Sequence, residues 1–260
     1  MKEIRLCDDG KLEFTADLCK INNLGMEIQS LYNPYIEDKE EILKRYKKIL
    51  PEIIGGKSYH APFWDLNLGT KIKELQETMM NIYNEAYSYA KELNCTEIVI
   101  HSNYKPGTDW YSGWISRAKT FLEAFLKDKD DSITICIENQ FESDSELLMK
   151  LIDEVNDSRV KICLDIGHVN ANSNMPVEEW IETLNNRIAY YHLHNNHGKQ
   201  TIYGYNKDDE HLAINNGTLD IKKTLELAEK YSPDAIWNIE CKVEFLEDSI
   251  KCLKELSYIN

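Results

Sequence analysis

The chain has 260 residues, of which 42% are hydrophobic and 29% are charged, and its formal net charge is −15. This composition is typical of a globular protein with one substantial core, and no apolar run approaches the roughly 20 residues that a membrane span requires. The acidic charge repels polyanions, so it disfavours nucleic acid as a partner without excluding it.

The seven cysteines include no Cys-x-x-Cys pair, and the first ten residues, MKEIRLCDDG, lack the apolar segment of a secretory signal. An odd number of cysteines argues against a disulfide framework and favours a reducing compartment. We therefore expect a cytoplasmic protein with no membrane partner.

Short β-branched runs alternate with charge-rich amphipathic segments along the chain. The expected strands are 3–7, 25–31, 58–61, 97–101, 133–139, 160–168, 188–194 and 235–241. The expected helices, whose apolar residues recur at spacings of three and four, are 13–23, 38–54, 71–93, 114–128, 143–156, 177–186, 219–230 and 245–256. Strand and helix in regular succession predict a parallel sheet that closes into a single-domain (β/α)₈ TIM barrel. An open doubly wound sheet is the alternative, but no glycine-rich turn follows the first strand.

Polar side chains stand at the carboxyl ends of the last six expected strands. In chain order they are His60, His101, Glu138, Asp165 with His168 three residues later, His192 and Glu240. Charged groups at such buried positions are costly unless they are paired or coordinated, and in a barrel these ends meet at one mouth. Imidazole and carboxylate together are the ligands of zinc, manganese or iron(II), so we predict a divalent metal centre.

The stretch YYHLHNNHG (190–198) contains three of the seven histidines. We expect His192 to hold a metal. His194, two residues on, faces the same side of the strand, so it is expected to contact a ligand or the substrate, or to be an alternative ligand. We interpret His197 as a loop histidine. In the following loop, Asp209 and His211 can bring two more ligands over the mouth.

On these motifs the sequence resembles the xylose isomerase-like TIM barrel superfamily, which includes sugar and sugar-phosphate isomerases, epimerases and AP endonucleases of the endonuclease IV class. The likeness covers nearly the whole chain and implies one such barrel over 1–260. It runs through HAPF (60–63), EIVIHSNY (97–104), ICIEN (135–139), CLDIGHVNA (163–171), HLHNN (192–196), DEH (209–211) and IE (239–240).

The resemblance implies two possible ligand sets. A single-metal site of the epimerase type would use Glu138, Asp165, His192 and Glu240. A trinuclear site of the endonuclease type would add His60 and His101 beside Glu138, and a third set of His168, Asp209 and His211. Every position holds a suitable residue, so we expect one to three zinc, manganese or iron ions per chain.

Two reactions follow from these sets. In a sugar or sugar-phosphate isomerase or epimerase, the metal would stabilise an enediolate, Glu138 and Glu240 would act as acid and base, and His168 would bind substrate oxygens. The expected substrate contacts are Glu27, Trp64, His194 and Lys242. The alternative is a phosphoester hydrolase of the endonuclease IV (AP endonuclease) type with up to three zinc ions. A small phosphoester substrate would reconcile its ligand set with the acidic charge of the chain.

Three features bear on this choice. The second strand, with Glu27, resembles the Gly-x-Glu strand of isomerase-like members. Asn195 stands where relatives often have Asp, and Asn215-Asn216-Gly217 replaces their Gly-x-Gly, which affects the loop over the third set.

A degenerate barrel that only binds a ligand is a third interpretation. Barrels of this class often pair, so a homodimer is also compatible with the sequence.

Overall fold

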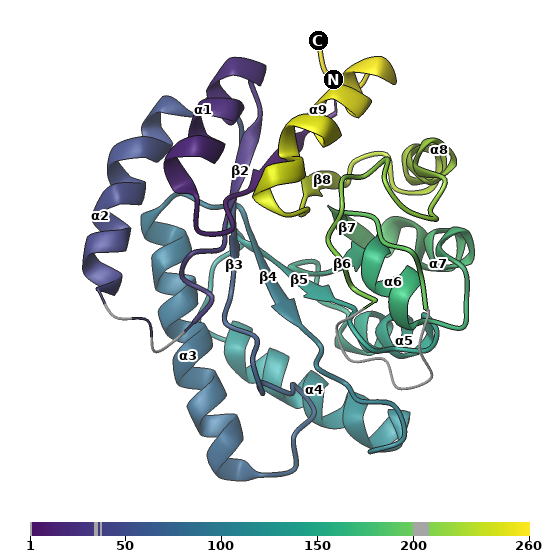
Figure 1. Ribbon diagram of the computed structural model, residues 1–260. Coiled ribbons are helices and arrows are strands. Elements are labelled where there is room, and N and C mark those ends of the chain that lie inside the picture. Colours follow the sequence, from purple (N-terminus) through teal and green to yellow (C-terminus); the bar gives the residue numbers. More distant parts are fainter. Residues whose placement is uncertain (1, 34–35, 37, 200–207) are drawn as a thin grey trace.

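The computed structural model describes residues 2–33, 36, 38–199 and 208–260. Over these residues, eight parallel strands pair in chain order and close into a barrel, and helices surround it (Figure 1). The predicted (β/α)₈ TIM barrel is therefore confirmed. The strands are β1 (Ile4–Cys7), β2 (Gly25–Ile28), β3 (Lys57–His60), β4 (Glu97–His101), β5 (Thr134–Glu138), β6 (Val160–Asp165), β7 (Ile188–Leu193) and β8 (Ile236–Ile239).

The helices follow the expected amphipathic segments to within a few residues. They are α1 (Leu12–Asn22), α2 (Lys39–Ile49), α3 (Lys73–Glu92), α4 (Tyr111–Leu126), α5 (Glu146–Val155), α6 (Ile166–Asn172), α7 (Val177–Leu184), α8 (Ile221–Tyr231) and α9 (Leu246–Glu255), with short 3₁₀ turns η1 (Leu50–Glu52), η2 (Asn185–Arg187) and η3 (Val243–Phe245). In the described part of the chain, no helix is long and apolar enough to cross a bilayer.

Helix α6 is a departure from the expected strand 160–168. Strand β6 ends at Asp165, whose carboxylate accepts a hydrogen bond of 2.6 Å from the backbone N–H of His168. A side-chain acceptor at this position starts a helix, because it satisfies an N–H group that has no partner in the first turn. His168 therefore lies on α6 rather than on a strand.

The helices cover the barrel through apolar stripes. On α5, the buried residues Leu147, Leu148, Leu151, Ile152 and Val155 recur at helical spacing on one face. Such a stripe stabilises the helix by removing apolar surface from water. The charged residues of α5 stay on the opposite face.

The barrel interior contains a layer of small and aromatic side chains. Val99, Cys136, Cys163, Tyr190 and Ile236 pack against one another, so the two cysteines belong to the barrel core as expected. All seven cysteines lie within the described residues, are buried and form no disulfide.

The amino ends of the strands are filled by an ion-pair cluster. Arg5 is 1% exposed and pairs with Glu3 at 2.6 Å and with Glu97. Above it, the hydroxyl groups of Tyr190 and Ser58 lie 2.6 Å apart. The interior is thus packed at this end, and a cavity is found at the carboxyl ends of the strands.

Candidate metal centre

The predicted ligands meet at the carboxyl ends of the strands. His60, His101, Glu138 and Asp165 are the last residues of β3, β4, β5 and β6, His192 is the last but one of β7, and Glu240 follows β8. The strand register places His101 beside Glu138 and Asp165 beside His192. None of the six is more than 8% exposed.

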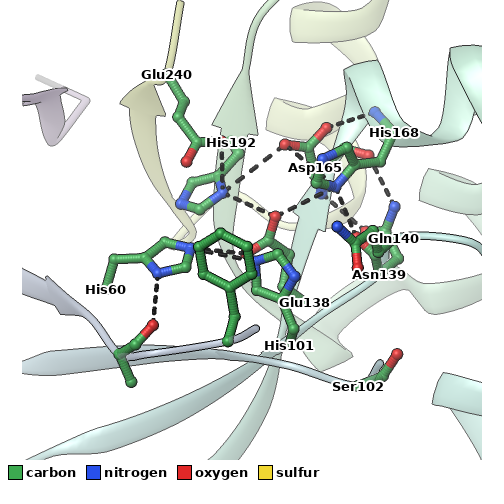
Figure 2. Close-up of polar contacts among 12 residues, drawn as sticks. His60, His101, Ser102, Glu138, Asn139, Gln140, Asp165, His168, His192 and Glu240 are labelled. Atoms are coloured by element: carbon green, nitrogen blue, oxygen red, sulfur yellow. Dashed lines mark hydrogen bonds and ion pairs between the residues drawn. The ribbon is translucent and has the colours of Figure 1, made fainter. Parts of the chain in front are cut away.

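The first cluster consists of His60, His101 and Glu138 (Figure 2). The Nε2 atoms of the two histidines lie 3.2 Å apart, and Glu138 Oε2 lies 3.4 Å from His60 Nε2 and 3.0 Å from His101 Nε2. The Nδ1 of His60 faces the Ala61 carbonyl oxygen at 2.9 Å, so this nitrogen carries the hydrogen and Nε2 keeps its lone pair. Tetrahedral zinc with bonds of roughly 2.0–2.1 Å separates its ligand atoms by about 3.3 Å. The first cluster matches that spacing.

The second cluster consists of Glu138, Asp165, His192 and Glu240. His192 Nδ1 lies 3.2 Å from Glu138 Oε1, 3.0 Å from Glu240 Oε2 and 3.8 Å from Asp165 Oδ2. Figure 2 shows His192 between the two glutamates. Because Glu138 directs Oε2 to the first cluster and Oε1 to the second, it can bridge two cations.

The third cluster consists of His168, His194, Asp209 and His211. Asp209 Oδ2 lies 3.3 Å from His168 Nε2 and 3.2 Å from His211 Nε2. The opposite nitrogens face carbonyl oxygens: His168 Nδ1 faces Asn139 at 2.8 Å and His211 Nδ1 faces Glu240 at 2.7 Å. A carbonyl oxygen can only accept a hydrogen bond, so each Nδ1 atom carries the ring hydrogen. Both Nε2 atoms therefore keep their lone pairs for a cation.

The residues present fit divalent cations. Among the described residues, the buried atoms that lack a hydrogen-bond partner include both oxygens of Glu138, His192 Nδ1, Asp209 Oδ1 and Glu240 Oε2. Leaving such atoms unpaired away from water is costly, and a cation would satisfy them. The imidazole and carboxylate donors suit zinc, manganese or iron(II).

The pKa values describe the same clusters without a cation. Burial opposes protonation of His211, but Asp209 and Glu240 outweigh it and raise the pKa of His211 to about 9. Burial opposes ionisation of Asp165, but His168 and His194 outweigh it and lower the pKa of Asp165 to about 2. Without a cation, His211 therefore carries a proton at neutral pH, and cation binding at the third cluster would displace it.

A cavity of about 350 Å³ lies over the clusters, a size typical of small-molecule sites. Trp64, which is 56% exposed, belongs to its wall. The wall includes these predicted site residues: His60, Trp64, His101, Glu138, His168, Asp209, His211, Glu240 and Lys242.

The other predicted site residues lie beneath this wall. Asp165, His192, Glu27 and His194 are all fully buried. Glu27 was expected to contact substrate, and His194 to contact substrate or a ligand or to be an alternative ligand. The structure places Glu27 against His192 at 3.2 Å and His194 against Asp165 at 3.1 Å. At these positions the two side chains can orient or supplement the predicted ligands.

Sequence reasoning missed three neutral neighbours of the ligands. Gln29 lines the cavity and donates its amide hydrogens to Glu240 and Glu27. The ring of Phe63 stacks on His101 with centroids 4.5 Å apart. Gln29 lies two residues after Glu27, and Phe63 lies in the HAPF motif, so chain proximity to predicted site residues was the available signal.

Asn139 is the third missed neighbour, and it joins β5 to β6 beyond the strand ends. Its side-chain amide donates to the Asp165 carbonyl oxygen at 2.9 Å and accepts from the Asp165 N–H at 2.9 Å. Its own carbonyl oxygen faces His168. Asn139 thereby fixes the positions of two predicted ligands without being a ligand itself.

Comparisons with known proteins agree with this architecture. The chain is 28% identical over 206 residues to the uncharacterized protein MJ1311 of Methanocaldococcus jannaschii, a match that covers 74% of this chain and 66%, just under two thirds, of that protein. Among solved structures, the TTHB071 protein from Thermus thermophilus, soaked with ZnCl₂, has a TM-score of 0.78 at 19% identity and 98% coverage of both chains.

Two further structures share the fold. A D-tagatose 3-epimerase-like protein has a TM-score of 0.78 at 22% identity, with coverage of 98% of this chain and 97% of that chain. The IOLI protein with a bound zinc atom has a TM-score of 0.73 at 12% identity, with coverage of 98% and 96%. The family model described as "Xylose isomerase-like TIM barrel" matches residues 21–256. This match spans most of the closed barrel, and it shows that the chain belongs to the xylose isomerase-like TIM barrel family.

Proposed function

We propose that the protein is a divalent-metal-dependent isomerase or epimerase that acts on a small sugar or sugar phosphate. The observation that carries this proposal is the pair of carboxylates, Glu138 and Glu240, that approach His192 Nδ1 at 3.2 and 3.0 Å beneath an open cavity. Asp165 completes the four donors. The likeness to a D-tagatose 3-epimerase-like structure supports the proposed substrate class.

A cation held by the second cluster would supply Lewis acidity to adjacent carbonyl and hydroxyl oxygens of an open-chain sugar. The chain's own carboxylates supply the proton transfer. Charges on His101 and His192 outweigh burial and hold the pKa of Glu138 well below its usual range, so Glu138 is ionised at neutral pH and can accept a carbon-bound proton. Glu240 lines the same cavity and, after taking a proton from solvent, can return one to the substrate.

Three further residues of the wall would position the substrate. When the third cluster holds no cation, His168 Nε2, which lies 3.3 Å from Asp209 Oδ2 at the side of the cavity, is free to contact substrate oxygens. Trp64 offers an exposed ring against which the apolar face of a sugar can pack. Lys242 adds a cation to the wall, which suits a phosphate or a polar substituent of the substrate.

The alternative candidate is a hydrolase of small phosphoesters. The first and third clusters favour it, because a single-metal reaction does not need them. It is also favoured by Glu138, whose Oε2 faces the first cluster and whose Oε1 faces the second. Two cations bridged by a carboxylate can activate a water molecule and stabilise the leaving oxygen.

One experiment separates the two reactions. The protein is loaded with Zn²⁺ or Mn²⁺, the metal content per chain is measured, and a panel of ketoses and ketose phosphates in D₂O is followed by NMR for deuterium incorporation at carbon. Small phosphoesters and an abasic duplex are tested in parallel. Deuterium exchange at a sugar carbon supports the proposal, and phosphoester cleavage without exchange replaces it with the alternative.

A further inference from the structure

We propose that His194 is a fourth protein ligand of the third cluster, so that a cation bound there is enclosed by His168, His194, Asp209 and His211. Ligand atoms of all four residues lie within 4.8 Å of one another. His194 is fully buried, its Nε2 lies 3.7 Å from Asp209 Oδ1, and its Nδ1 has no hydrogen-bond partner among the described residues.

The backbone holds His194 and His211 together. Asn195 and Leu212, the residues that follow them, form an antiparallel bridge with N–H to carbonyl distances of 3.2 and 2.9 Å. The two imidazole rings consequently stack, with centroids 3.9 Å apart and planes 13° from parallel. The Nε2 atoms of both rings face the same carboxylate, His194 Nε2 at 3.7 Å from Asp209 Oδ1 and His211 Nε2 at 3.2 Å from Asp209 Oδ2.

Gly167 creates the space that His194 occupies. A Cβ atom at position 167 would overlap the Cε1, Nδ1 and Nε2 atoms of the His194 ring. The backbone of α6 can therefore approach the ring only because residue 167 has no side chain. Any side chain at position 167 would therefore displace the His194 ring from its place beside the third cluster.

The extra ligand changes the character of the third site. Zinc sites with four protein ligands are generally structural, whereas catalytic sites keep a position open. Over the described residues, the first cluster offers three protein ligands and borders the cavity, so its cation would retain such a position. A closed third site would instead connect α6, the end of β7 and the segment 208–211 without binding substrate directly.

A competing role for His194 is to orient Asp165, whose oxygens lie 3.1 and 3.2 Å from Nε2. In that case the loss of His194 would weaken the second cluster rather than the third. The two roles differ in which cation depends on His194. That difference can be measured without any assay of activity.

The test compares His194→Gln, His211→Gln and the double variant, each loaded with Zn²⁺, passed over a weak chelator and analysed for metal per chain. His197→Gln is the matched control, because His197 lies three residues from His194 but outside the clusters and contacts Glu210 at 2.7 Å. We expect each single variant to lose the same one equivalent of zinc, the double variant to lose no more, and the control to lose none.

Several outcomes would overturn the inference. These are a full zinc content in His194→Gln, a double variant that loses two equivalents, or a wild-type protein that holds one cation only. The last outcome would leave the proposed epimerase intact, since that reaction needs only the second cluster. Should the variants fail to fold, an anomalous-scattering map of the zinc-loaded wild type decides. A peak within about 2.1 Å of a His194 nitrogen supports the inference, and water in its place overturns it.

Discussion

The carboxylate of Glu27 lies against His192, with both oxygens 3.2 Å from Nε2, and both side chains are fully buried. Glu27 also accepts hydrogen bonds from the side-chain amides of Asn238 and Gln29 at 3.0 and 3.1 Å. The arrangement assigns the imidazole hydrogen to Nε2, so Nδ1 presents its lone pair to the second cluster. A carboxylate that accepts the ring N–H of a metal-binding histidine also makes the other ring nitrogen a stronger electron-pair donor to the metal.

Glu27→Gln should therefore weaken cation binding at the second cluster by roughly 10- to 100-fold while leaving the fold intact. Competition with a chromogenic chelator measures the affinity. Glu142→Gln is the matched control, because Glu142 is a buried glutamate that contacts Ser102 and Gln140 rather than a cluster. Wild-type affinity in the Glu27 variant would show that this contact does not tune the ligand.

Glu138→Gln should lower turnover by at least about 100-fold under either proposed reaction, since it removes the proton acceptor of the isomerase and the bridging carboxylate of the hydrolase. It should also reduce the metal content, because one of the two oxygens that face the first and second clusters becomes a neutral amide nitrogen. The control is Glu210→Gln. Glu210 is partly exposed and pairs with His197, so this variant should have little effect on either turnover or metal content. Near-normal turnover in Glu138→Gln would exclude both reactions.

Trp64→Ala should raise KM by about fivefold with a small change in kcat. The loss of an aromatic contact worth roughly 1 kcal/mol weakens the binding of the substrate and of the transition state equally. The control is Trp110→Ala, since Trp110 is 85% exposed and lies outside the described cavity wall. Steady-state kinetics on the substrate found by the NMR panel provides both constants. A fall in kcat at constant KM would indicate that Trp64 acts on the reacting atoms instead.

Cation affinity should keep rising with pH up to about pH 9 rather than levelling off above the usual histidine range. Asp209 and Glu240 outweigh burial and raise the pKa of His211 to about 9, so in the metal-free protein this residue is protonated at pH 7 and must lose its proton on binding. The corresponding contribution to metal-free stability is complete below pH 6.5 and is lost as pH rises through about 9.

Calorimetric titrations with Zn²⁺ in buffers of different ionisation enthalpy count the protons released at each pH. More protons should be released at pH 7 than above the pKa of His211, which is about 9. His211→Gln should remove part of this difference. A proton count that does not change between these two conditions would contradict the expected protonation state.

Gly69→Ala should lower the free energy of unfolding by about 1–3 kcal/mol, because the added methyl group has no space. A Cβ atom at this position would overlap the indole ring of Trp114, which is 1% exposed and donates a hydrogen bond of 2.7 Å to Asn67. Gly113→Ala, in the first turn of α4, should be neutral or stabilising, since it adds helix propensity and the nearest atom to the new Cβ, at 3.3 Å, is Nη1 at the end of the flexible Arg117 side chain. Urea unfolding of both variants tests the contrast, and equal stabilities would show that the Trp114 region can repack.

The sequence alone was sufficient to predict the barrel and the positions at which polar residues interrupt its strands. Alternating strand and helix periods are local properties, and so is the placement of His60, His101 and Glu138 at strand ends. The limits of β6 were less accessible, because the Asp165 side chain starts α6 only through its contact with the His168 backbone.

Only the tertiary structure decided how the ligands are grouped. That Glu138 faces two clusters, that Glu27 supports His192 from across the barrel, and that His194 lies beside His211 are contacts between residues far apart in the chain. Such contacts depend on the strand register and on how the closed barrel tilts its strands, and a shift of one residue turns a side chain to the opposite face. Residue type and spacing set which groups can bind a cation, whereas barrel closure sets which of them share one.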